Sequence, residues 1–169
     1  MEAANLFCGD DDPSKSKHLT LTEIALPVLE ENYQDHHPGG SLVGIEVNVG
    51  VSKLSSTFKL GGWDPDMLNE FGLGRVGTKN FTSYGVVRNK RTGGLIEVKA
   101  VMAGRLGKIE GEAFTRGEFQ SHDYAINGIL HYELYWQGRE KFYWDFFSSD
   151  YRINGRDENA QEKRILRLI

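Results

Sequence analysis

The chain has 169 residues, of which 39% are hydrophobic and 26% are charged, with 20 glycines and only 4 prolines. This length and composition predict one globular domain spanning residues 1–169 and exclude a wholly disordered chain. The net charge of −4 argues against a non-specific nucleic-acid binder, which would normally be basic. No segment approaches the ~18 consecutive apolar residues of a membrane-spanning helix, and no signal peptide is expected.

The first half of the chain predicts short strands around one flexible joint. Residues 19–26 have the composition of a strand, and Pro27 ends it. Residues 45–51 alternate apolar and polar side chains with the period of a half-buried strand. We expect this strand to turn near Ser52 and pair with residues 57–60, giving an extended hairpin over 41–60. Gly39 and Gly40 would form the joint before it.

The second half predicts longer strands and two helices. Asp64 and Pro65 are a capping residue and a first-turn proline, so a helix of about two turns should start there. Strands are expected over 81–87, 95–105, 119–136 and 141–147, and a second helix after Asp157. A single strand over 119–136 would exceed the usual ~3–10 residues, so Gly128 should bend or bulge it. The fold class is therefore mainly β, with antiparallel strands.

No motif predicts catalysis, a cofactor or a metal site. Gly72 to Gly77 match the dinucleotide-binding glycine pattern in letters, but the pattern follows a helix and precedes a strand, the reverse of what phosphate binding needs. His36 and His37 are neighbours, so in an extended chain they point in opposite directions. Cys8 is the only cysteine, which excludes an internal disulfide and favours a reduced, buried thiol.

Several short motifs, spread in order over nearly the whole chain, point to one family. They are Asn5-Leu6-Phe7, Leu26-Pro27-Val28-Leu29, Gly39-Gly40, Val101-Met102-Ala103-Gly104-Arg105, Tyr132-Glu133-Leu134 with Gly138-Arg139-Glu140, and Ile153-Asn154-Gly155-Arg156-Asp157. This ordered set resembles the major tail tube proteins of contractile-tailed bacteriophages and is similar to the tube proteins of R-type pyocins.

The resemblance implies a β-sandwich or half-barrel with a packed helix, six copies of which form a ring that closes a continuous barrel. Stacked rings would make a tube through which DNA passes transiently, within a virion tail assembled in the host cytoplasm. The implied partners are further copies of the chain, the tail sheath, the tail tip or baseplate, and a terminator protein, with no membrane contact. The long strands agree with this reading, because barrel closure removes exposed strand edges.

Two alternatives remain open. The chain could be the tube subunit of a bacterial bacteriocin or secretion machine, which would share the fold and differ in cargo. It could also be a carbohydrate-binding β-sandwich that uses exposed aromatic side chains such as Trp63, Trp136 and Trp144.

Two polar strand faces are candidates for the channel wall. The alternation predicts that the opposite faces, which include Ile45, Val47 and Val49 on one strand and Ile96, Val98 and Met102 on the other, pack in the core. A wall that bound DNA phosphates would hold the DNA, so it should be polar and neutral or negative. The expected lumen-facing residues are Glu46, Asn48, Ser52, Glu97, Lys99 and Arg105.

Overall fold

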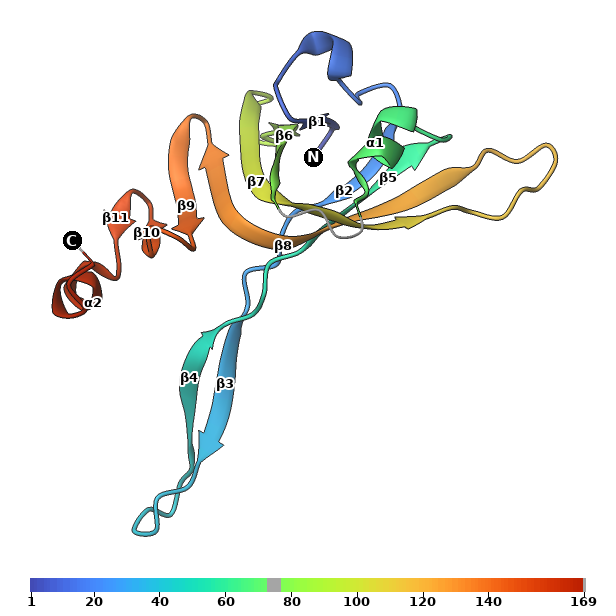
Figure 1. Ribbon diagram of the computed structural model, residues 1–169. Helices are drawn as coiled ribbons and strands as arrows, with labels where there is room; N and C mark the ends of the chain where they lie inside the picture. Colours follow the sequence, from blue (N-terminus) through green and yellow to red (C-terminus); the bar gives the residue numbers. More distant parts are fainter. Residues whose placement is uncertain (73–76, 169) are drawn as a thin grey trace.

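The computed structural model describes residues 1–72 and 77–168 and consists mostly of antiparallel strands (Figure 1). Its strands are β1 (Ala3–Cys8), β2 (Leu21–Ala25), β3 (Glu31–His36), β4 (Ile45–Val51), β5 (Ser56–Gly61), β6 (Lys79–Arg88), β7 (Leu95–Glu110), β8 (Ser121–Trp136), β9 (Arg139–Asp145), β10 (Asp150–Ile153) and β11 (Arg156–Asp157). Its helices are the 3-10 helix η1 (Pro13–Lys15), α1 (Pro65–Glu70) and α2 (Ala160–Ile165). The predicted mainly-β class is confirmed.

One large sheet contains all strands except β3 and β4. Its main path runs β1-β6-β7-β8-β9-β10-β11, and β5 pairs with both β8 and β2. Every pairing is antiparallel, and the sheet is strongly curved (Figure 1). Of these strands, β1, β10 and β11 were not predicted, because their short segments show no clear alternation.

The 16-residue strand β8 is divided by a bulge at the predicted place. Its first part, up to Ile126, pairs with β5, and its last part, from His131, pairs with β9. Ala103 of β7 pairs with His131 of β8, whereas Arg105, two residues later, pairs with Asn127, four residues earlier on β8. Gly128 lies in this register shift with a φ of 57°, a left-handed conformation that glycine adopts without strain. The bulge lets one strand serve two partners.

The extended hairpin is present, but it is not the one predicted for 41–60. β4 pairs with β3, whereas residues 57–60 belong to β5 and pair with β2 and β8. The hairpin therefore spans 31–51 and projects from the sheet (Figure 1). Gly39 and Gly40 form its tip rather than a joint before it. Alternation identified β4 as a strand, but it cannot identify a partner whose side chains are all polar or aromatic, as in β3.

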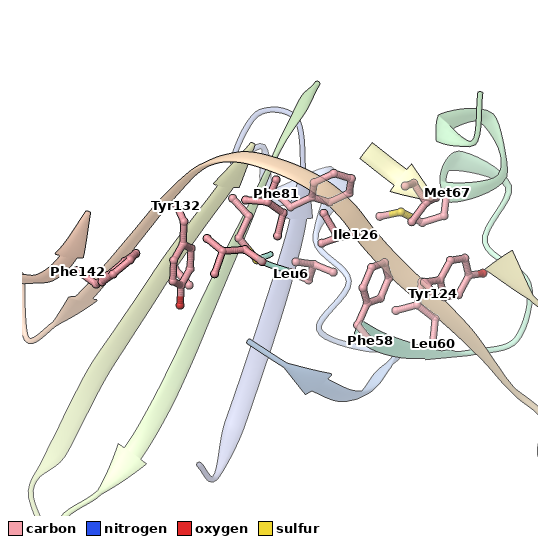
Figure 2. Close-up of a cluster of buried hydrophobic side chains, with 14 residues drawn as sticks. Leu6, Phe58, Leu60, Met67, Phe81, Tyr124, Ile126, Tyr132 and Phe142 are labelled. Carbon is pink, nitrogen blue, oxygen red and sulfur yellow. The ribbon is translucent and has the colours of Figure 1, made fainter. Parts of the chain in front are cut away.

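The core lies on the concave side of the large sheet, beneath β8 (Figure 2). The side chains of Leu6, Phe58, Met67, Met102 and Tyr132 are all at most 1% exposed. The Phe58 ring stacks on Tyr124 with their centroids 5.0 Å apart. Strands β1, β5, β7 and β8 and helix α1 each contribute to this cluster, so it contains residues from both halves of the chain.

Both predicted helices form: α1 has about the expected two turns, and α2 covers only six residues of the C-terminal segment. The Asp64 side chain accepts hydrogen bonds from the backbone N–H groups of Asp66 and Met67, at 3.0 and 3.2 Å, which is the expected N-cap. Among the apolar side chains within and directly after α1, Met67 is buried, while Leu68 and Phe71 are exposed. Part of the Gly72 to Gly77 pattern, residues 73–76, lies outside the described residues. None of the described helices is long and apolar enough to cross a membrane.

Candidate assembly surfaces

The β3–β4 hairpin has one acidic face and one aliphatic face. The register places Asp35 opposite Glu46 and Tyr33 opposite Asn48, so these four side chains share a face. Gln34 lies opposite Val47 and His36 opposite Ile45 on the other face. Every residue of both strands is exposed. Within the described residues, neither Asp35 nor Glu46 forms an ion pair, although like charges directly opposite each other are destabilising.

The structure therefore corrects the expected burial of the β4 apolar residues. Ile45, Val47, Val49 and Val51 are between 42% and 56% exposed instead of lying in the core. The hairpin stands away from the sheet (Figure 1), so among the described residues no other element covers Ile45 and Val47 on its aliphatic face. Exposed stripes of this kind mark protein–protein contacts.

Two of the three hairpin candidates for the channel wall lie on the acidic face. Glu46 and Asn48 are on β4 and share that face with Asp35. Ser52 follows β4, and its hydroxyl donates a hydrogen bond of 2.9 Å to the Asn32 carboxamide oxygen. The backbone N–H of Ser52 also donates to the Glu30 carbonyl at 2.8 Å, which closes the base of the hairpin. Ser52 therefore has a structural role at the base.

The three β7 candidates lie on the face of the large sheet opposite the core. Between Leu95 and Leu106 the burial alternates, and Val98, Ala100 and Met102 on the other face are buried as predicted, whereas Ile96 is only partly buried. The Lys99 ammonium lies over the Tyr84 ring, 5.4 Å from its centroid. The Arg105 guanidinium donates a 2.9 Å hydrogen bond to the Gly72 carbonyl.

The hairpin set and the β7 set belong to two different sheets, so one protomer does not bring them together. Glu97 and Lys99 line a small hollow of about 200 Å³ together with Glu133 and Tyr135. Two acids and one lysine thus share this part of the surface.

A polar network on the same face of the sheet was not predicted. The His131 imidazole lies between two carboxylates, with Nδ1 3.0 Å from Asp145 and Nε2 2.9 Å from Glu133. The Tyr135 hydroxyl donates to the other Glu133 oxygen at 2.9 Å. His131, Glu133 and Tyr135 recur with period two, which could have indicated one face, but the Asp145 partner comes from β9 and depends on the strand register.

Charges in this network and on the neighbouring residue Glu140, opposite Tyr135, are held by specific hydrogen bonds. The Arg152 guanidinium donates to both oxygens of Glu140, which lowers the pKa of Glu140. A hydrogen bond from the Ser148 backbone N–H, with a further contribution from His131, lowers the pKa of Asp145. Burial, followed by the hydrogen bond to Glu133, raises the pKa of Tyr135 to about 12. At neutral pH the carboxylates of Glu140 and Asp145 are therefore charged and the Tyr135 phenol is neutral.

An apolar groove of about 720 Å³ lies at the base of the hairpin. Leu54, Ile129, Phe142, Trp144 and Tyr151 supply its apolar lining, and Asn159 and Glu162 from the C-terminal segment border it. Sequence reasoning missed this groove, because its walls come from the hairpin base, the β8 bulge, β9 and β10.

The described residues contain no group of three or more histidine, cysteine, aspartate or glutamate side chains placed to hold a metal ion. His36 and His37 lie at the exposed hairpin tip, where the His37 ring lies against Gly44. Cys8 is a free, half-buried cysteine.

Solved structures with a similar fold are parts of contractile injection systems. A chain of the sheath-tube complex of an extracellular contractile injection system, PVC, has a TM-score of 0.56 and 10% identity, covering 79% of this chain and 88% of that one. A chain of the PVC sheath/tube terminator has a TM-score of 0.55 and 10% identity over 81% and 94%. A chain of the tube-terminating cap of the anti-feeding prophage has a TM-score of 0.52 and 11% identity over 73% and 82%. At 10–11% sequence identity, this structural similarity establishes the fold alone.

Sequence comparison supplies the family. No curated protein matches the chain. The family model for phage tail tube protein FII, however, matches residues 5–166, which is nearly the whole chain and all of the large sheet except the start of β1. The chain therefore belongs to the phage tail tube protein FII family.

Proposed function

We propose that six copies of this tail tube protein form a ring, and that rings stack into the inner tube of a contractile tail. The observation that carries the proposal is the β3–β4 hairpin, which exposes Ile45 and Val47 on one face and Asp35 and Glu46 on the other. In the part of the chain that the structure describes, no other element covers these faces. An isolated two-stranded hairpin is marginal in water, so contact with other copies should order it.

The two faces of the hairpin also suggest which residues line the channel. A hairpin that buries its aliphatic face against other copies leaves the acidic face for the wet bore, with Glu46 and Asn48 facing the DNA. Glu97, Lys99 and Arg105 on β7 would line the bore beside them. Lys99 lies over the Tyr84 ring and Arg105 binds a backbone carbonyl, which reduces the freedom of both cations to bind phosphates.

The proposed partners are the sheath outside the tube and a terminator and a baseplate at its ends. Similar folds occur in chains from a sheath-tube complex, a terminator and a baseplate, which supports these partners. The particle would be a virion tail assembled in the host cytoplasm. A phage-like injection particle is the second candidate, because the similar solved chains come from such particles.

Removal of the hairpin tests the proposal. The Ser52 N–H binds the Glu30 carbonyl at 2.8 Å, so two glycines can replace residues 31–51 without moving the strands on either side. We expect this variant to keep its thermal transition and to lose tube formation in electron micrographs. The matched control shortens the β6–β7 turn by replacing residues 90–93 with two glycines. Tubes of normal length from the hairpin deletion would contradict the proposal.

A further inference from the structure

We propose that the aliphatic face of the β3–β4 hairpin of one copy lies in the apolar groove at the hairpin base of a second copy. This inference rests on the tube assembly proposed above and assigns the surface that receives the hairpin.

The groove is an apolar surface that the described residues leave uncovered. Leu54, Ile129 and Phe142 in its walls are at most 9% exposed, so they form a firm floor, and Trp144 and Tyr151 are half-buried beside them. Its 720 Å³ falls within the ~300–1,000 Å³ of sites that hold a substantial ligand. Water in contact with such walls is unfavourable, which favours an apolar occupant.

The hairpin offers matching side chains on a thin, projecting element. Ile45 and Val47 lie on one face of a two-stranded ribbon whose strands are exposed throughout. The branched aliphatic side chains of β4 are stiff, so little side-chain entropy is lost when they are buried. The opposite face carries the charged side chains of Asp35 and Glu46. Because burying charges in an apolar groove is unfavourable, only the face with Ile45 and Val47 can enter it.

The occupant is a second copy because of where the groove lies. Val51 and Ser52 belong both to the base of the hairpin and to the lining of the groove. The hairpin leads away from this point, so its tip lies far from its own base (Figure 1), where the groove is. A copy displaced along the hairpin direction would bring its own hairpin to this groove. Such head-to-tail contacts repeat without closing, as the stacking of rings requires.

Charge complementarity favours the same pairing. Residues 30–52 contain four acids, Glu30, Glu31, Asp35 and Glu46, and no lysine or arginine. The C-terminal segment beside the groove, residues 139–168, contains exposed cations that form no ion pair within the described residues. They are Arg139, Lys141, Arg156, Arg164 and Arg167, against the unpaired acids Glu158 and Glu162. The acidic hairpin would be steered towards this basic rim.

Disulfide trapping between two differently labelled copies tests the contact. In a Cys8→Ala background, one preparation carries Ser55→Cys in the groove, and the other carries Val47→Cys on the aliphatic face. After mixing, assembly and mild oxidation, a heterodimer requires the two Cβ atoms to approach within about 4.5 Å. We expect several-fold more heterodimer than with the matched control Glu46→Cys on the acidic face. Equal yields, or a heterodimer with Phe114→Cys from the β7–β8 loop instead, would overturn the proposal.

A groove-filling variant separates this inference from tube assembly itself. Ser55→Trp places an indole in the groove from an exposed position, and Thr57→Trp places one on a neighbouring exposed position outside it. We expect Ser55→Trp to form rings that do not stack, and Thr57→Trp to form tubes. If both variants form tubes like the unmodified chain, the groove assignment is wrong and tube assembly stands. If the unmodified chain forms no tubes, the proposed function is wrong.

Discussion

Cys8 lies at the end of β1, opposite Phe81 on β6, in a place that suppresses thiol chemistry. Burial, with a smaller contribution from the Glu70 carboxylate, raises the pKa of the thiol from 9.0 to about 11. The reactive form of cysteine is the thiolate, so the folded protein holds its only cysteine in the unreactive form.

A thiol-reactive dye should therefore react slowly with Cys8 in the folded protein. A pKa about two units above its ordinary value lowers the thiolate fraction at pH 8 by about a hundredfold. We expect the labelling rate to rise by at least that factor in denaturing urea. Labelling of the native protein at the rate of the unfolded chain would contradict this account. A dimer band from intact particles on a non-reducing gel would overturn our expectation that Cys8 stays reduced in the assembled tail.

At the scale of elements, α1 depends on one carboxylate with two tasks. One oxygen of Asp64 caps the helix, and the other lies 2.7 Å from the ammonium of Lys17, whose side chain is only 10% exposed. Asp66 also approaches Lys17, at 3.5 Å, but is largely exposed. The pair with Asp64 connects α1 to the segment after η1.

Substitutions at Asp64 should separate the two tasks. Asp64→Asn keeps a good capping side chain and removes the charge, so it should lower the free energy of unfolding by about 3 kcal/mol through the buried lysine. Asp64→Ala should lose about 1 kcal/mol more with the cap. Asp66→Asn, the matched control, should change stability by less than about 1 kcal/mol. Urea denaturation measures all three, and equal losses for Asp64→Asn and Asp66→Asn would refute the buried pair.

The C-terminal segment is fixed by Lys163 of α2, whose ammonium lies 2.6 Å from both Asp150 and Asp157. The hydrogen bond from Lys163 is the largest cause that lowers the pKa of Asp150 below its ordinary 3.8. When folding lowers the pKa of a carboxyl group, its charged form stabilises the folded protein at any pH above the pKa of that group in the unfolded chain. This stabilisation is lost as the pH falls through the pKa that the group has in the folded protein.

We therefore expect the segment 150–165 to lose stability in acid. The melting temperature should be nearly constant at neutral pH and should fall below about pH 4, where Asp150 is protonated in the unfolded chain. Asp150→Asn should melt lower at pH 7 and show a weaker fall in acid. Parallel melting curves for the two proteins between pH 2 and pH 7 would show that Asp150 does not carry this dependence.

Elements with strong local signals were predictable, and their pairings were not. The helix start at Asp64 and the bulge at Gly128 follow from the residues themselves. The predicted pairing partner of β4 was wrong, because the true partner β3, with the sequence ENYQDH, has no aliphatic side chain to show alternation. The groove could not be predicted from the sequence, because its lining residues are brought together only by the strand register.

At the scale of the whole molecule, the apolar alternation of β4 has a different meaning from that of β7. Both strands show period two, but β7 buries Val98 and Met102 within the chain, and β4 exposes Ile45 and Val47. A pattern specifies that one face should leave water, and it does not specify which chain covers that face. Under the proposed assembly, the same period-two pattern marks both the face that other copies cover and the face that forms the core of the chain.

The charge of the proposed channel wall gives a prediction for DNA. Each cation added to the wall should add a phosphate contact, and because every ring repeats it, binding should rise steeply and fall with salt. Glu46→Lys should therefore make assembled tubes retain DNA at low salt and release it as salt increases. Glu118→Lys, the same charge change in the β7–β8 loop, is the matched control.

Co-sedimentation of tubes with short duplex DNA across a salt series distinguishes the two variants. We expect retention by Glu46→Lys tubes to exceed that of Glu118→Lys tubes by at least tenfold at low salt, and the difference to vanish at high salt as counterion release weakens. A neutral variant, Glu46→Gln, should fall between the unmodified tube and Glu46→Lys. Equal retention by the two lysine variants would place Glu46 outside the bore and leave the acidic face of the hairpin as outer surface.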